Sequence, residues 1–456
     1  MDKKSFFSLL LLLLFSFALQ AQSKKWTLEE CVGYAIQHNI SIKQTELDTK
    51  IAAIDKKEAK GNFLPSLNAN ASHSWNIGLN QDITTGLLRN QTTQFTSAGA
   101  SVGIDIYKGL QNQNTLRKAN LSIVAAQYQV VKMKEDIALN VANAFLQVLF
   151  NQENLKVQQE QLAINEKQLL RSEELVKAGS IPKGDLLDVK ATVATNNQNV
   201  VTAENALLIS KLSLAQLLQL KDFYDFDVAN ATSAKDENNI LNQTPNAIYE
   251  KARDNRTDLK IAKTNLAIAE KNVAIAKGAF QPSLAGFYNF SSRVSDADGF
   301  SFDSEGNIIG TRGPNAFFNQ FSDNKGQTFG AQLTIPIFNG FSVKNNVARS
   351  KVSLEKSKIA VQQQELDLEQ NVYTAFTDAK GALNTYESAI VALEARQEAY
   401  HYASEKYAVG MMNSFDFNQA QTVLSNAQSE VIRTKYDSIF KLKILEFYFG
   451  IPIVKN

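Results

Sequence analysis

The stretch AKGNFLPSL at residues 59–67 returns as AKGAFQPSL at residues 276–284. The offset between these two stretches is 276 − 59 = 217 residues. Further along, IDIYKGL at residues 104–110 corresponds to IPIFNGF at residues 335–341, where the offset is 335 − 104 = 231. Internal similarity of this kind indicates a repeat architecture. The sequence therefore predicts two copies of one structural unit, over residues 22–230 and 231–456.

The change of offset locates an insertion in the second copy. The difference, 231 − 217 = 14 residues, must arise between the two landmarks, within residues 291–327. This segment is rich in Gly, Asp, Asn and Ser, the residues typical of turns and loops. We predict that residues 295–324 form a surface loop that lies between two strands, on the side away from the helices.

The amino terminus predicts export. Lys3 and Lys4 precede an apolar run that ends near the small residue Ala21, as in a secretory signal peptide, here residues 1–21. No later stretch approaches the roughly 20 apolar residues that a membrane-spanning helix needs. A membrane protein with this sequence must therefore span the bilayer with strands.

The long segments of each copy carry an apolar residue every seven positions, which is typical of coiled coils. A four-residue slip interrupts the period at the same place in both copies, as a stutter does. A helix from about Leu110 to Lys177 would be roughly 100 Å long. The period resumes after Gly179 and Pro182, so each copy is predicted to contain an antiparallel helical hairpin. The first-copy positions are Leu116, Ile123, Val130, Ile137, then Val141, Val148, Leu155, Leu162, Leu169 and Val176.

Amphipathic strands interrupt the helical pattern. Apolar and polar residues alternate over residues 67–79, 98–106 and 329–337, and less cleanly over 284–292. Strands of about 10 residues with one apolar face are typical of outer-membrane barrels. Four strands cannot close a barrel, and unpaired edges are costly in hydrocarbon, so the chain must oligomerise. Trp75, Tyr107, Phe280 and Phe338, near predicted strand ends, suit either an interfacial aromatic girdle or buried packing.

Two other classes of protein would explain part of the pattern. A periplasmic coiled-coil adaptor would explain the hairpins but not the strands within each copy. An exported enzyme is disfavoured because His38, His73 and His401 lack ligand spacing, and no phosphate-binding loop or catalytic constellation is present. With a net charge of +1, the chain has no overall electrostatic field that would attract nucleic acid. The single cysteine, Cys31, cannot form an intramolecular disulfide. No cofactor, metal site or enzymatic activity is predicted.

Four motifs resemble the TolC family of outer-membrane efflux proteins over nearly all of the mature sequence. They are TLEECVGYA at 27–35 with His38 and Asn39, ARDNRTDLK at 252–260, IPIFNG at 335–340, and YAVG at 407–410 through Asp416. Thr27 and Glu30 also fit a helix capping box, a purely structural interpretation of the first motif.

The resemblance implies an α+β membrane protein in the outer membrane of a Gram-negative bacterium. Three chains would form a 12-stranded β-barrel in lipid, continuous with a 12-helix α-barrel in the periplasm. This homotrimer would be the gated exit duct of a tripartite efflux pump or type I secretion system. A periplasmic adaptor (membrane fusion) protein would join it to an inner-membrane transporter driven by protons or ATP.

The helical turns are the candidate functional positions. We expect Gly179, Ser180, Gly410, Met411 and Met412, at the turns between long helices, to form the adaptor-docking surface. The alternatives are glycine caps without a partner role and, for the methionine pair, soft-metal export.

The resemblance also implies that Asp416 lines the periplasmic mouth as a three-fold ring, where the family often has a second acidic residue at the position of Gln419. Asp185 and Asp188 are the first-copy equivalents, which the resemblance places farther from the narrowest point. A helix-capping role for Asp416 explains the residue equally well.

Overall fold

The computed structural model describes residues 25–81, 88–221, 226–229 and 240–453. The predicted signal peptide and the boundary between residues 230 and 231 lie outside these ranges. The chain forms two compact units. The helical unit comprises the segment up to Asp48, residues 126–262 and residues 361 onward, and the strand unit comprises residues 49–125 and 263–360.

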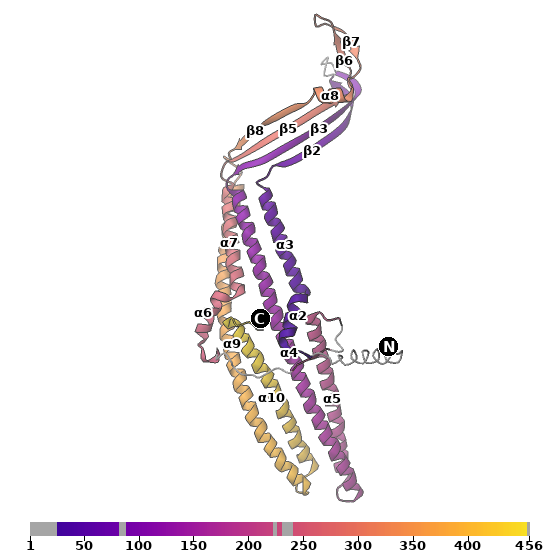
Figure 1. Cartoon of the computed structure of the whole chain (residues 1–456), viewed down its shortest axis with the longest axis vertical. Helices are drawn as coiled ribbons and strands as arrows, with labels where there is room; N and C mark the ends of the chain where they lie inside the picture. Colours follow the sequence, from indigo (N-terminus) through magenta and orange to yellow (C-terminus); the bar gives the residue numbers. More distant parts are fainter. Residues whose placement is uncertain (1–24, 82–87, 222–225, 230–239, 454–456) are drawn as a thin grey trace, which may run out of the picture. The chain divides into compact units, whose positions relative to one another are not determined.

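Four helices and two strands occur in the same order in both copies, and the second copy has further elements between its strands (Figure 1). The first contains α2 (Leu28–His38), α3 (Ile40–Gly61), β2 (Ser66–Gln81), β3 (Leu88–Lys108), α4 (Gln111–Lys177) and α5 (Lys183–Leu218). The second contains α6 (Pro245–Asn255), α7 (Thr257–Gly278), β5 (Ser283–Ser295), β8 (Gly326–Thr334), α9 (Ser342–Ala408) and α10 (Ser414–Phe449). Equivalent helices have equal lengths of 11, 22, 67 and 36 residues. The repeat and both helical hairpins are therefore confirmed.

Short elements connect these. β1 (Lys25–Trp26) pairs in parallel with β4 (Asp227–Val228), and a 3-10 turn, η1 (Ile240–Asn242), precedes α6. Thr27 caps α2 through the predicted capping box, since its hydroxyl accepts from Glu30 N at 3.2 Å and Glu30 Oε2 accepts from Thr27 N at 3.1 Å.

The strand unit contains one antiparallel sheet of four strands in the order β2-β3-β5-β8 (Figure 1). Among the described residues, β2 pairs only with β3 and β8 only with β5, so both edges of the sheet are open. The predicted fourth strand is too long: β8 ends at Thr334, before Ile335 and Ile337. Pro336 has no N–H to donate to a strand partner, which explains the early end.

The inserted segment is more ordered than a simple loop. It contains a hairpin of β6 (Gly299–Phe302) and β7 (Ile308–Arg312), followed by α8 (Phe317–Asp323). Helix α8 is held against β5, because Ser292 Oγ donates to the Phe321 carbonyl at 2.7 Å and Asn324 Nδ2 donates to the Arg293 carbonyl at 2.7 Å. The sequence predicted a surface loop here and did not predict these elements, and the place of the segment at the cell surface stays a prediction.

Two glycines allow the end of β3 to touch the end of α7. A Cβ added to Gly278 would lie 2.4 Å from the Gly109 carbonyl oxygen, and one on Gly109 would lie 2.1 Å from that of Gly278. Gly109 also has a φ of 57°, which favours glycine. The repeated glycine motifs thus mark a direct backbone contact inside the strand unit.

Two apolar clusters stabilise the helical unit. One joins α2, α4 and α5 with residues of α10, and its most buried members include Cys31, Phe145, Leu149 and Leu214. The other joins α6, α7, α9 and α10 around Ile248, Leu259, Val372 and Leu445. Among the described residues, no helix combines the length and apolar composition required to cross a bilayer.

Candidate functional site at the hairpin tips and the helix junction

Both hairpin tips turn through the same backbone motif. Gly179 N donates to the Val176 carbonyl at 3.0 Å and Ser180 N to that of Leu175 at 2.8 Å. In the second tip, Gly410 N donates to the Tyr407 carbonyl at 3.2 Å, and Met411 N to that of Lys406 at 2.8 Å. This is the Schellman pattern that ends helices at a left-handed residue.

Glycine is needed at both turns for its conformation rather than for space. Gly179 has a φ of 71° and Gly410 a φ of 79°, and a Cβ at either position would meet nothing within 4 Å. Gly179, Ser180 and Gly410 are exposed, and Met411 is 77% exposed while Met412 is half-buried. These residues form a free surface on one chain, and their role in docking stays a prediction.

Aromatic packing and two hydrogen bonds hold the tips of the helical unit together. The ring of Tyr407 stacks on Phe417 with centroids 4.5 Å apart, and Tyr400 lies 5.7 Å from Phe417. Gln168 Nε2 on α4 donates to Tyr407 Oη at 2.9 Å. Asn418 Nδ2 on α10 donates to Thr192 Oγ1 on α5 at 3.4 Å. The two hairpins are therefore joined near their turns.

Asp416 is the third residue of α10 and is exposed. The helix cap is Asn413, whose Oδ1 accepts from Asp416 N at 2.8 Å and whose Nδ2 donates to Asp416 Oδ2 at 2.9 Å. Asn413 and not Asp416 therefore caps α10. The Asp416 carboxylate accepts a hydrogen bond from the side chain of this cap residue. Gln419 is exposed one turn further along α10.

The first tip presents a different surface. Asp185 is in the first turn of α5 and half-buried, and Asp188 is exposed. Pro182 occupies the N-cap position and gives no side-chain cap. The two tips are therefore not equivalent, although their turns are.

Three of the four candidate interface aromatics lie where the sheet meets the helices. Tyr107 is near the end of β3 and its hydroxyl donates to Gln281 Oε1, Phe280 precedes β5, and Phe338 follows β8. Trp75 lies further along β2, opposite Gln94. All four are exposed on this chain, and their place at a lipid interface stays a prediction.

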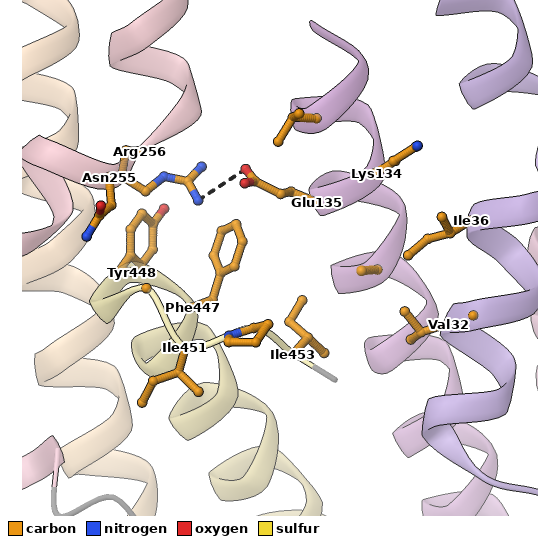
Figure 2. Close-up of a pocket in the computed structure, with 15 residues that line it drawn as sticks. Val32, Ile36, Lys134, Glu135, Asn255, Arg256, Phe447, Tyr448, Ile451 and Ile453 are labelled. Atoms are coloured by element: carbon orange, nitrogen blue, oxygen red, sulfur yellow. Dashed lines mark ion pairs between the residues drawn. The ribbon is translucent and has the colours of Figure 1, made fainter. Parts of the chain in front are cut away.

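Arg256 at the break between α6 and α7 is a residue whose role the sequence did not reveal. Its side chain is only 8% exposed. The guanidinium lies 2.6 Å from Asp258 Oδ2 and 3.5 Å from Glu135 Oε2 on α4, and it stacks over the Phe447 ring at 4.3 Å (Figure 2). A planar guanidinium suits this combination of ion pairing and stacking.

Further polar and charged groups contact Asp258 and Glu135, the two ion-pair partners of Arg256. Lys132 Nζ lies 2.9 Å from Asp258 Oδ1 and 3.1 Å from Asp136 Oδ2, and Thr257 Oγ1 donates to Glu135 Oε1 at 3.0 Å. Burial raises the pKa of Glu135 above its ordinary value, although Arg256 and Thr257 oppose the shift. Burial also acts to raise the pKa of Asp258, but Lys132 and Arg256 outweigh it and lower that pKa.

A pocket of about 470 Å³ lies beside this junction, within the helical unit (Figure 2). Its walls are mostly apolar and come from α2, α4, the α6–α7 break and the end of α10. The lining residues include Val32, Ile36, Glu135, Arg256, Phe447 and Ile453. The junction thus ties helices of the first copy to helices of the second.

The first copy has a simpler version of the same break. Asn39, equivalent to Arg256 by the offset of 217, separates α2 from α3 and is buried. Its Nδ2 donates to the Leu217 carbonyl at 3.2 Å, and its Oδ1 accepts from Ser41 N at 2.9 Å. Only the ARDNRTDLK motif could have drawn attention to Arg256, and nothing in that motif indicates Glu135 as a partner.

Among the described residues, no three His, Cys, Asp or Glu side chains are grouped so that they could hold a metal ion. Burial raises the pKa of the Cys31 thiol to about 12, with further contributions from Glu30 and Glu29.

Comparisons with known proteins agree with this architecture. The model of the family described as "Outer membrane efflux protein" matches residues 32–219 and 248–447, which is most of the chain. This chain belongs to the outer membrane efflux protein family. The resemblance noted in the sequence is therefore confirmed, as is the outer-membrane efflux channel fold with its two repeated halves. The periplasmic adaptor alternative is wrong.

Relatives support the assignment. The chain is 23% identical to the outer membrane protein TolC of Escherichia coli K12 over 407 residues, covering 88% of this chain and 77% of TolC. It is 25% identical to the cation efflux system protein CusC of E. coli O6:H1 over 364 residues, covering 77% of this chain and 70% of CusC. The solved CmeC outer membrane channel of Campylobacter jejuni superposes with a TM-score of 0.75 at 18% identity, covering 93% of this chain and 86% of CmeC.

As a member of the outer membrane efflux protein family, the protein is a channel subunit of the outer membrane. Proteins of this family are channels rather than enzymes. Its strand unit supplies the four-stranded sheet and its helical unit the two hairpins that such a channel requires.

Proposed function

We propose that three copies of this outer membrane efflux protein close one channel, which serves as the exit duct of a tripartite pump or type I secretion system. The observation that carries this proposal is the sheet with two open edges, β2 and β8. Unpaired N–H and C=O groups cost several kcal/mol each in hydrocarbon. Three chains of four strands give 12, a number within the range of outer-membrane barrels.

The apolar side chains of the sheet support a lipid-facing surface. Ile77 is 81% exposed and Phe329 is 82% exposed on the single chain. Such exposure of large apolar side chains is expected where lipid rather than water is the neighbour.

The periplasmic end would dock a membrane fusion protein at the exposed tips, and that adaptor would connect the channel to an inner-membrane transporter driven by protons or ATP. The channel itself supplies passage and no energy. Asp416 would form a three-fold ring at the mouth, where three like charges attract cations.

Native mass spectrometry of the detergent-solubilised full chain tests the assembly. We expect a trimer that requires detergent for solubility. A monomer that stays soluble without detergent would overturn the proposal, because its sheet edges would then be compatible with water.

A further inference from the structure

One row of core positions on α4 is polar. Counting three residues on from the apolar heptad positions Val148, Leu155, Leu162 and Leu169 gives Asn151, Gln158, Asn165 and Ser172. A hairpin normally places apolar residues at both of its core positions. The corresponding second-copy positions, at an offset of 231, carry Ala382, Ala389, Arg396 and Ala403, so this polar row is particular to α4.

The structure places part of this row on the wall of a chamber of about 340 Å³ inside the helical unit. Helices α4, α5 and α10 form the walls. The lining side chains are amides and hydroxyls with two alanines, and none is charged. Asn199, Thr422 and Asn426 at the rim are exposed, so solvent reaches its edge.

Two buried amides of the chamber have polar atoms that no other described residue pairs with. Gln421 on α10 is 2% exposed, and neither its Nε2 nor its Oε1 forms a hydrogen bond to the described residues. Asn165 is 1% exposed, and its Nδ2 also lacks a partner among them. A buried donor or acceptor that stays unsatisfied costs about 1–3 kcal/mol.

We propose that this chamber is a binding site for a cluster of ordered water molecules that bridges α10 to α4 and α5. Water fits because each molecule both donates and accepts, as the unpaired oxygen and nitrogen atoms of Gln421 require. An ion fits poorly because the walls carry no charge. One water needs only about 10–15 Å³ of such cavity space, so the chamber is large enough for a cluster of waters.

The bridging waters make the contact of α10 with α4 and α5 at the chamber different from the apolar cluster around Phe145 and Leu214. If α10 separates from α4 and α5 at the chamber, each amide exchanges a bridging water for a bulk water. If the helices separate at the apolar cluster, apolar side chains become exposed to water instead. Water therefore fixes the register of α10 through hydrogen bonds without adding dry contact area.

Cysteine accessibility tests the proposal. In the full-length trimer, Ala203→Cys places a thiol on the chamber wall, and Ala215→Cys places one in the apolar cluster on the same helix α5. The parent alanines are 5% and 2% exposed, so burial alone does not separate them. The probe is a small cationic methanethiosulfonate, which needs water and a thiolate to react. Peptide mass spectrometry follows each thiol, with buried Cys31 as an internal reference.

We expect the thiol of Ala203→Cys to react at least tenfold faster than that of Ala215→Cys. Equal rates, whether both slow or both fast, would overturn the proposal, because the chamber would then be no wetter than the core. Ser425→Cys in the chamber and Ser438→Cys elsewhere on α10 repeat the comparison with near-isosteric changes. A fast Ser438→Cys with a slow Ser425→Cys would also overturn it.

Discussion

Arg256 shows how one side chain can link the two copies of the repeat. It contacts Glu135 and Asp258 and stacks on Phe447, so α4, the α6–α7 break and the end of α10 meet at its guanidinium. Removing one partner of a buried ion pair leaves an uncompensated charge, which is far more costly than replacing both partners.

We expect Arg256→Ala to destabilise the protein by about 3 kcal/mol in chemical denaturation of the purified full chain. Arg253→Ala is the matched control, because Arg253 lies on α6 one turn before Arg256, is 44% exposed and, among the described residues, forms its ion pair with Glu250. The control should change stability by less than about 1 kcal/mol. Equal effects of the two substitutions would show that the junction contributes nothing special.

The same junction predicts a dependence on pH. The pKa of Asp258 is lower in the folded protein than in the unfolded chain, so its contribution to stability is present above about pH 4 and lost as the pH falls further. Glu135 has a raised pKa and acts in the opposite sense, since its contribution is lost as the pH rises through that value.

Asp258→Asn should therefore lower stability at pH 7 and flatten the loss between pH 5 and pH 3. Unfolding measured across this range checks it. Asp254→Asn, at an exposed carboxylate on α6, should leave the wild-type slope unchanged. If Asp258→Asn loses as much stability between pH 5 and pH 3 as the wild-type protein does, the ion pairs that cause this loss do not involve Asp258.

Asp416 tests the proposed mouth. Asp416→Ala should reduce cation selectivity and block by multivalent cations in planar-bilayer recordings, because a ring of three carboxylates would be lost. Asp185→Ala, the first-copy equivalent, should have a smaller effect. Unchanged selectivity with reduced thermal stability would show that Asp416 acts only as the partner of Asn413.

Among the elements, the β6–β7 hairpin accounts for the size of the insertion. It spans residues 299–312, which is 312 − 299 + 1 = 14 residues, the length deduced from the two offsets. Gly299 and Arg312 are paired across the hairpin, so its two ends lie side by side.

Deleting residues 299–312 and joining Asp298 to Gly313 should leave trimer assembly intact, because closing the shorter connection costs little conformational entropy. Native mass spectrometry in detergent measures the trimer. Deleting α8 instead should reduce assembly, since its hydrogen bonds to β5 would be lost. Loss of the trimer after the hairpin deletion alone would contradict the prediction.

The tip turns permit a test of docking that does not disturb the backbone. Met411 is exposed and follows the glycine turn, so Met411→Asp should weaken crosslinking to the adaptor and reduce export while the trimer persists. Val391→Asp, at an exposed apolar position within α9, is the control. Unchanged crosslinking in Met411→Asp would place docking elsewhere.

The elements were predictable because their patterns are local. Heptad and two-residue periods depend only on neighbours in sequence, and they predicted the hairpins and all four strands of the sheet. The end of β8 was missed because its pattern continued through Pro336. The inserted hairpin was missed because its composition resembles that of an irregular loop.

The sites were less predictable because they depend on distant contacts. Glu135 and Arg256 lie far apart in sequence, and no periodicity indicates that they meet. The same holds for Gln168 with Tyr407 and for the amides of the chamber. The polar row on α4 was visible in the sequence, but only the position of Gln421 on another helix gave it a meaning.

At the scale of the whole molecule, the open sheet edges and the paired helices impose one architecture on both copies. The strand unit is incomplete without other chains, whereas the helical unit already contains two apolar clusters of its own. Assembly is therefore required first by the membrane and only secondarily by the periplasmic helices.

The equal lengths of α4 and α9, and of α5 and α10, limit how the protein can change by descent. One heptad added to the first hairpin alone would move its turn by about 10 Å and separate Gln168 from Tyr407. A change in the length of this duct that keeps the contact therefore needs matching changes in both halves of the gene, so the two hairpin lengths are expected to vary together.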